Sequence, residues 1–206
     1  MKKSILFFII CFGFITAQAQ VKFGSKAGLN YSHIKDFGEN KSRFGIYGGL
    51  IAEINATKRI FIRPEVLYSS KGKRYSSTGF NSSGAIRFNY ASIPLLVGFM
   101  PSRNFSVMAG PELNFLINVN SVFDGSDHDM TQFYEKFDLA INVGAAYKLT
   151  GILSIEARYS HSLKDLIEVE FADNMGNILR RDKIGNHRVF QFGLVYYFRR
   201  GKTKEG

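Results

Sequence analysis

Residues 105–119 read FSVMAGPELNFLINV, and every second residue of this stretch is apolar. The apolar set comprises Phe105, Val107, Ala109, Pro111, Leu113, Phe115, Ile117 and Val119. The polar residues Glu112, Asn114 and Asn118 alternate with them. A period of two is typical of a β-strand whose two faces meet different surroundings. The stretch therefore predicts a strand with one face in an apolar medium and the other in a polar one.

Seven further stretches share this alternation. They are residues 21–31, 43–55, 60–69, 88–100, 137–149, 153–160 and 189–198. No position on the eight apolar faces is charged, although 21% of the chain is Asp, Glu, Lys or Arg. A lipid bilayer explains this absence, because an Arg or Lys that faces its midplane costs a barrel about 2–4 kcal/mol. A soluble β-sandwich also alternates, so the connections between the strands are needed to distinguish the two folds.

The connections between these strands alternate between long and short. The long ones are residues 32–42, 70–87, 120–136 and 161–188, and the short ones are residues 56–59, 101–104 and 150–151. Short periplasmic turns and long outer loops are typical of up-and-down barrels in the outer membrane. We therefore expect an all-β fold, a single antiparallel up-and-down transmembrane β-barrel of about eight strands at residues 20–198. Its long loops lie outside, and the basic tail at 199–206 lies in the periplasm.

The first nineteen residues have the layout of a cleaved secretory signal peptide. Lys2 and Lys3 precede an apolar run at 5–15, and Ala17-Gln18-Ala19 is a small-x-small cleavage sequence. The run is too short for a membrane-spanning helix, which needs about 20 residues, and an N-terminal anchor helix is the alternative. Cleavage removes Cys11, the single cysteine. For an exported chain of net charge +10, we expect outer-membrane lipid and lipopolysaccharide as partners and no nucleic acid.

The polar faces of the eight strands carry six basic and five acidic residues. The basic ones are Lys22, Lys26, Arg43, Arg63, Lys148 and Arg158, and the acidic ones are Glu53, Glu65, Glu112, Asp138 and Glu156. An eight-stranded barrel is just wide enough for side chains to fill it, and buried charges have to pair. We expect a structural interior charge network that contains Arg63, Glu65, Glu112, Glu156 and Arg158. A transport path is the alternative.

Three prolines, Pro64, Pro94 and Pro111, fall inside predicted strands. Proline cannot donate to the hydrogen-bond ladder of a sheet and prefers edges or bulges. Because a closed barrel has no edge, we expect bulges at these positions, or strands that begin later than the alternation indicates.

Two stretches of these strands resemble motifs of a known family. Residues 63–72, RPEVLYSSKG, and residues 90–96, YASIPLL, resemble the P-E-L-L-Y-S-x-K-G and Y-x-x-I-P-L-L motifs of the porin-family outer-membrane β-barrel domain, also called PorT-like. Gly110-Pro111 and residues 156–159 are similar to later elements of that family. The resemblance implies an eight-stranded outer-membrane barrel without catalytic residues, with the prolines as family features. Tyr197-Phe198 resembles the terminal aromatic signal that the barrel-assembly machinery reads, so this machinery is an expected partner.

No residue pattern strongly predicts a catalytic, cofactor-binding or metal site. The four histidines fall in or beside the long loops. Ser160-His161-Ser162 with Asp165 or Glu168 is the nearest approach to a hydrolase set, and polar loop residues are the simpler interpretation. Residues 124–129 are acidic but lack the twelve-residue calcium-loop pattern with its terminal Glu. We therefore expect no enzyme, no cofactor and no metal ion.

The long connection at 70–87 is basic. Its cationic residues are Lys71, Lys73, Arg74 and Arg87, and no Asp or Glu occurs at 66–111. We expect this segment to be an anion-binding loop that docks lipopolysaccharide phosphates by charge. An ordinary solvated loop is the alternative.

Three classes of function remain from the sequence. The first, which we favour, is a non-catalytic structural or interaction barrel whose extracellular loops contact other envelope proteins, since a small barrel is filled by its own side chains. The second is a narrow or gated porin-like channel for small solutes. The third is a lipid-acting barrel enzyme or a lipocalin-like binder.

Overall fold

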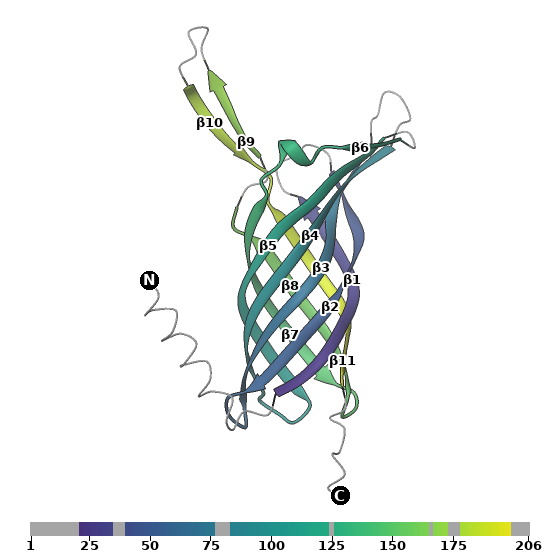
Figure 1. Ribbon diagram of the computed structural model, residues 1–206, viewed down its shortest axis with the longest axis vertical. Coiled ribbons are helices and arrows are strands. Elements are labelled where there is room, and N and C mark those ends of the chain that lie inside the picture. The colour runs from purple at the N-terminus through teal and green to yellow at the C-terminus, as the bar shows by residue number, and fades with distance from the viewer. Residues whose placement is uncertain are drawn as a thin grey trace, which may run out of the picture.

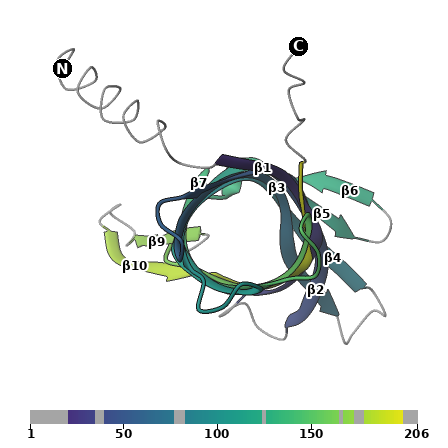
Figure 2. The same ribbon diagram turned by 90° about the horizontal axis from the view of Figure 1, so that it is seen from below.

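Eight long strands form a closed antiparallel barrel (Figure 1) in the computed structural model, which describes residues 21–34, 40–76, 83–123, 126–164, 167–172 and 178–198. The strands are β1 (Val21–Ile34), β2 (Asn40–Asn55), β3 (Ile60–Ser76), β4 (Ser83–Phe99), β5 (Phe105–Phe123), β7 (Phe137–Lys148), β8 (Leu153–Ser162) and β11 (His187–Tyr197). Pairing of β1 with β11 and of β4 with β5 closes the ring seen in Figure 2. The predicted up-and-down barrel of eight strands is confirmed.

Four short elements interrupt this pattern. After β5, the strand β6 (Ser126–Asp129) pairs with the far end of β5, and the 3-10 helix η1 (Thr131–Phe133) follows it. Between β8 and β11, β9 (Ile167–Ala172) and β10 (Ile178–Ile184) form a separate hairpin that projects away from the barrel (Figure 1). None of the helical segments among the described residues is long and apolar enough to cross a membrane.

The barrel has a turn end and a loop end. The three short connections lie at the turn end, together with the start of β1 and the end of β11, and the four short elements lie at the loop end (Figure 1). Each short turn contains a hydroxyl, of Thr57, Ser102 or Thr150, that accepts a hydrogen bond from a backbone N–H three residues later. Such local bonds allow the chain to reverse within a few residues.

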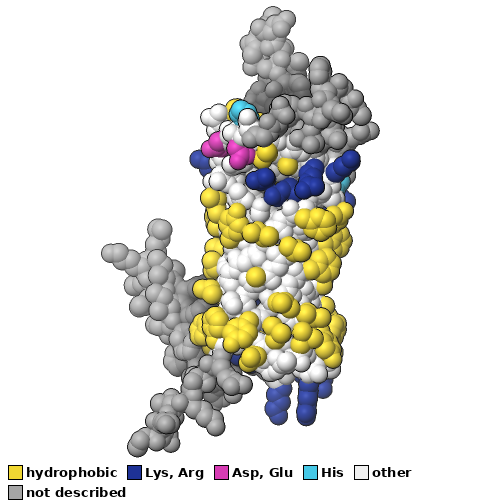
Figure 3. Space-filling view, turned by 90° about the vertical axis from the view of Figure 1, so that its right-hand side faces the viewer, with side chains coloured by type: hydrophobic (Ala, Val, Ile, Leu, Met, Phe, Trp, Pro, Cys, Tyr) yellow, Lys and Arg dark blue, Asp and Glu magenta, His cyan; other side chains and the backbone are white. Residues whose placement is uncertain are grey.

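The apolar faces of the eight strands point outward, as the alternation predicts. Exposed side chains on this wall include Phe23, Phe44, Ile46, Leu50, Val66, Val97, Ile117, Val143, Phe192 and Leu194. Near the loop end, aromatic rings of neighbouring strands adjoin: Tyr31 lies 5.1 Å from Phe44, and Tyr159 lies 4.9 Å from Phe190. Figure 3 shows hydrophobic side chains gathered in an upper and a lower zone of the wall, between the Lys and Arg side chains at its two ends. A wall with aromatic residues near its limits is typical of a barrel in a bilayer.

The predicted outward orientation is wrong for one residue of the apolar faces. Val119 is fully buried inside the barrel, although it continues the apolar series of residues 105–119. The register between β4 and β5 shifts here, because Leu116 and Asn118 face successive residues of β4 and Ile117 has no partner. This β-bulge adds one residue to β5 and exchanges the two faces beyond it.

The strands run further than the sequence predicts at the loop end. β3 continues to Ser76 and β4 begins at Ser83, so most of the expected loop at 70–87 is paired sheet. Both faces of β3 become polar there, with Ser70 and Arg74 on one face and Lys71 and Lys73 on the other. The hydrophobic alternation ends where the wall leaves the apolar band, but the hydrogen-bond ladder continues.

The prolines do not coincide with the shifts in register. Pro64 pairs with Leu95 and Pro111 pairs with Ile141 in ladders whose register is unchanged across them. The irregularities occur elsewhere, at residues 42–47 of β2 and at the bulge of β5. The expectation of bulges or late strand starts at the prolines is therefore wrong.

Candidate functional site

The inner faces of the strands bring most of the barrel's charged side chains into its lumen. Glu65 of β3 and Glu156 and Arg158 of β8 are each at most 4% exposed. β3 and β8 are four strands apart in either direction around the ring, so they lie on opposite sides of it. Any direct contact between their side chains therefore crosses the whole lumen.

A central network makes this crossing twice. Arg158 binds Glu65 through both of its terminal nitrogens, at 2.8 and 3.1 Å. Arg63 of β3 donates in the opposite direction to Glu156, at 2.9 Å. Lys26 of β1 completes the network by donating to Glu156 and, at 3.4 Å, to Glu65.

The network extends to the turn end and is neutral in formal charge. Arg63 Nη2 donates to Glu53 at 2.6 Å and to the Tyr197 hydroxyl at 2.8 Å, and Tyr197 donates to Glu53 at 2.7 Å. Three cations, those of Lys26, Arg63 and Arg158, thus meet three carboxylates. Buried ions are tolerated when each has partners of opposite charge.

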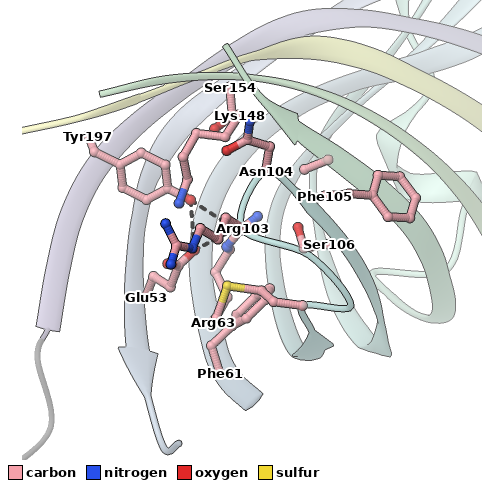
Figure 4. Close-up of a pocket in the computed structure, with 12 residues that line it drawn as sticks. Glu53, Phe61, Arg63, Arg103, Asn104, Phe105, Ser106, Lys148, Ser154 and Tyr197 are labelled. Carbon is pink, nitrogen blue, oxygen red and sulfur yellow. Dashed lines mark hydrogen bonds and ion pairs between the residues drawn. The ribbon is translucent and has the colours of Figure 1, made fainter. Parts of the chain in front are cut away.

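The turn end of the lumen is nearly filled. Figure 4 shows the small hollow beside Arg63, Glu53 and Tyr197, which is lined by Arg103 and Lys148 at its mouth. Its free volume is about 20 Å³, which suits a water molecule and is far below the size of a solute. The hollow is therefore no entrance to a channel.

A second polar cluster lies nearer the loop end. Lys71 of β3 donates to Glu112 of β5 at 2.9 Å and to Asn114 at 3.2 Å. Asn142 donates to the other oxygen of Glu112 at 2.7 Å, and Asn114 donates to Asp138 at 3.2 Å. This cluster has its own ion pair, between Lys71 and Glu112.

An aromatic layer covers that cluster on the side of the loop end. Phe88 lies 4.9 Å from Tyr134, which follows η1, and 5.0 Å from His187, with both rings edge-on to it. Tyr90 stacks on Phe88 at 6.5 Å. Ile34 and Val119 complete this buried group. The bulge that turns Val119 inward thus supplies part of the layer.

The structure brings four of the five predicted network residues into direct contact. Arg63, Glu65, Glu156 and Arg158 form the central network, whereas Glu112 pairs with Lys71 in the second cluster. The alternation placed Glu112 correctly inside. The sequence does not predict its partner, because the apolar alternation ends before Lys71 and indicates a loop there, although Ser69, Lys71 and Lys73 keep the inward period of two.

The predicted anion-binding loop is not a loop. Lys71 and Lys73 belong to β3 and are buried, at 1% and 6% exposure. Arg74 of β3 and Arg87 of β4 are exposed and point to the outer wall. Successive residues of a strand point to opposite sides, so one strand cannot present Lys73 and Arg74 to the same ligand.

The same alternation separates the residues of the hydrolase alternative. Ser160 and Ser162 of β8 are buried inside, and Ser162 donates to Asp138. His161 lies between them in sequence and therefore on the outer face of β8, where its ring stacks on that of Tyr159 with the centroids 6.4 Å apart. Asp165 and the side chain of Glu168 lie outside what the structure describes. The structure thus does not bring a serine and His161 together, and among the residues described no cluster of three or more His, Cys, Asp or Glu is arranged to hold a metal ion.

Comparisons with known proteins agree with this architecture. The structure of Ail, the attachment invasion locus protein of Yersinia pestis, in complex with the heparin analogue sucrose octasulfate, is similar with a TM-score of 0.52 and 12% identity over 87% of this chain and 99% of that one. Neisserial surface protein A is similar with the same score, identity and coverage. At such identities the likeness concerns the fold alone. No curated protein matches the sequence.

A family model described as outer membrane protein beta-barrel domain matches residues 16–168, about three quarters of the chain. The closed ring of eight strands, its apolar wall and its charged interior agree with that description. The chain therefore belongs to the outer membrane protein beta-barrel domain family and is an integral protein of the outer membrane.

Proposed function

We propose that this protein is a closed, non-catalytic barrel that acts by interaction through its loop end, with other envelope proteins as partners. The observation that carries the proposal is the central network, in which Arg158–Glu65 and Arg63–Glu156 join opposite walls of the lumen. A solute path along the axis would have to break both pairs. Short turns of such barrels face the periplasm, so we infer that the loop end faces outward.

The loop end offers the structure for such interactions. β6, η1 and the β9–β10 hairpin all lie beyond the ring, and the hairpin stands apart from it (Figure 1). A barrel of similar fold, Ail, has been crystallised with the polyanion sucrose octasulfate, which supports ligand binding as a role for barrels of this size. The separation of His161 from Ser160 and Ser162 supports a role without catalysis.

Conductance in planar lipid bilayers tests the closed lumen. We expect the full-length protein to insert without steady single-channel currents. The double variant E65A/R158A removes one neutral pair that crosses the lumen and should increase conductance, which shows that the assay detects an opened barrel. Steady currents from the unmodified protein would contradict the proposal and favour the narrow-channel alternative.

A photo-crosslinking amino acid, placed at the loop end in one variant and on the apolar wall in another, tests the interaction role. We expect one at Ser126 of β6, which is exposed at the loop end, to form adducts with envelope proteins in whole cells. The control position is Leu50, whose side chain faces outward on the apolar wall, and it should form adducts mainly with lipid. Equal protein adducts at both positions would count against the loop end as the site of interaction.

We further propose that the chain is exported by a signal peptide at 1–19, is inserted by the barrel-assembly machinery, and belongs with the PorT-like barrels of its family. The RPEVLYSSKG and YASIPLL stretches and the final aromatic pair support this. Mass spectrometry of the mature protein should find an N-terminus at Gln20 or Val21. An intact N-terminus in the membrane fraction would contradict the cleavage.

A further inference from the structure

Positive charge gathers on the outer wall at the loop end, over β2, β3 and β4. The exposed residues Lys41, Arg74 and Arg87 form this group, which we call the basic patch. Figure 3 shows Lys and Arg side chains in a row above the hydrophobic part of the wall. The patch differs from the predicted loop, because Lys71 and Lys73 face the lumen and Lys41 of β2 takes part instead.

The strand register forces these cations close together. Lys41 of β2 lies directly opposite Arg74 of β3, and Arg74 lies opposite Ala85 of β4, two residues from Arg87. Side chains directly opposite have Cβ atoms about 5 Å apart, and diagonal neighbours are about 7–8 Å apart. Like charges at such positions destabilise a sheet, so the patch is strained electrostatically unless an anion is bound.

Arg43 of β2 does not belong to the patch. It pairs with the buried Ser32 of β1 and precedes the outward Phe44, so it starts on the inner face. On the outer face, Gly72 lies opposite Arg87 in the register and two residues from Arg74, and it carries no side chain between them. Two guanidinium groups thus flank one bare position of the outer face.

Acidic residues do not offset this charge in the parts of β2, β3, β4 and β5 that lie at the loop end. Residues 40–52, 66–111 and 113–123 contain no Asp or Glu. In register, the first described carboxylate beyond Arg87 is that of Asp129 of β6, two strands away. Its Oδ1 already accepts hydrogen bonds from the N–H and the hydroxyl of Thr131. Among the residues that the structure describes, no carboxylate neutralises the patch, which is therefore open to an anion from outside the protein.

The height of the patch points to the source of that anion. Ala91 pairs with the outward aromatic Tyr68, and Arg87 lies four residues further along β4, which is about 13 Å along a strand and about 10 Å in height at a tilt of about 40°. Headgroups occupy the zone just outside the hydrocarbon core. Long basic side chains reach into that zone with their charged ends.

From this geometry we propose that the basic patch binds phosphate groups of an outer-leaflet lipid, approached from the side in the plane of the membrane. Guanidinium groups donate paired hydrogen bonds to phosphate oxygens, and several together hold a doubly charged group. The site is on the wall, so it does not depend on whether the lumen is closed.

Native mass spectrometry of the detergent-solubilised full-length protein, titrated with diphosphorylated lipid A, tests the proposal. The variant K41Q/R74Q/R87Q should bind at least about tenfold more weakly. The matched control K58Q/R59Q/R103Q removes the same charge from exposed residues at the turn end and should stay within about twofold. Lipid A without phosphates should bind the unmodified protein no better than it binds the patch variant.

Equal weakening by the patch variant and the control would overturn the proposal, since the effect would then be one of net charge. Complete competition by inorganic phosphate at the concentration of lipid A would also overturn it, because the site would then serve a free anion. Heat-dependent gel mobility verifies folding of each variant. If the triple variant does not fold, the single variants Arg87→Gln and Lys41→Gln decide, each with an expected loss of about threefold.

Discussion

The central network and the basic patch use the same kinds of cation in opposite ways. Inside, Lys26, Arg63 and Arg158 are matched by three carboxylates, and every one of these cations has a direct ion pair. Outside, Arg74 and Arg87 lie beside other cations, with no acid on their own strands at that end. The lumen has to supply its own counter-ions because it excludes other ligands. The wall can take them from the membrane.

Breaking the network from inside should have the largest effect. Arg63→Leu removes the closest cation of Glu53 and one of the three cations that pair with Glu156, and removal of one member of a buried pair costs about 3–5 kcal/mol. Urea unfolding in detergent micelles, followed by gel mobility, measures the change. The control Lys22→Leu removes a 40% exposed side chain, 3.4 Å from Glu53, and should cost at most about 1 kcal/mol. Equal costs for the two would mean that the interior pairs behave like surface pairs.

Gly72 lies between the second polar cluster, to which its neighbour Lys71 belongs, and the basic patch. Its φ of +151° disfavours L side chains, and an added Cβ would lie 2.0 Å from the carbonyl oxygen of Ile86. Gly72→Ala should therefore cost about 1–3 kcal/mol of unfolding free energy. Gly151→Ala meets no atom within 4 Å and should stay within about 0.5 kcal/mol. Tolerance of both substitutions would show that β3 is less constrained than its ladder suggests.

Removing a cation from the patch should not lower the free energy of unfolding, in contrast to the two substitutions above. In detergent without phosphate, Arg87→Gln should leave stability unchanged or raise it by up to about 1 kcal/mol, because it relieves repulsion from Arg74. The gain should shrink at high salt, where exposed charges are screened. Urea unfolding at two salt concentrations measures both. A loss like that of Arg63→Leu would erase the distinction between the two regions.

The smallest expected effect is a change in the pKa of Asp129 of β6, which lies beyond the hydrophobic band. Hydrogen bonds from the hydroxyl and the N–H of Thr131 hold the pKa of the Asp129 carboxyl below its ordinary value. Because the folded pKa is the lower one, the stabilising contribution is present above the unfolded pKa and is lost as pH falls through the folded pKa. Thr131→Val should raise the pKa of Asp129 toward its ordinary value in an NMR titration. An unchanged pKa would show that the hydroxyl bond does not form in solution.

Much of this fold follows from alternation alone, because lipid and lumen demand different residues at every second position. The prediction failed where that demand stops. Beyond the apolar band the outer face of β3 continues with Ser70, Gly72 and Arg74, so the sequence of β3 resembles a loop while its ladder persists. Val119 failed for a different reason, since a single unpaired residue exchanges the faces of β5 and leaves no mark in the apolar pattern.

The sequence predicts which charged residues of the candidate site face the lumen, but it does not predict which of them pair with each other. The inward position of Glu112 follows from its place in β5, but its pairing with Lys71 depends on which strand stands two places away in the ring. The Arg158–Glu65 pair likewise depends on the closure that sets β3 opposite β8. The period of two in the sequence carries no information on which strands lie near or opposite each other in the ring.

The extension of β3, β4 and β5 past the hydrophobic band has a consequence for reach. From Tyr68, the last lipid-facing aromatic of β3, to Arg74 is six residues, about 20 Å along the strand and about 15 Å in height at a tilt of about 40°. The sheet therefore carries β6 and η1 beyond the hydrophobic band. An antibody or protease that is too bulky to approach the lipid surface should still reach Ser126 on intact cells. Arg87 lies nearer the hydrophobic band, where lipid headgroups have access to it and large proteins do not.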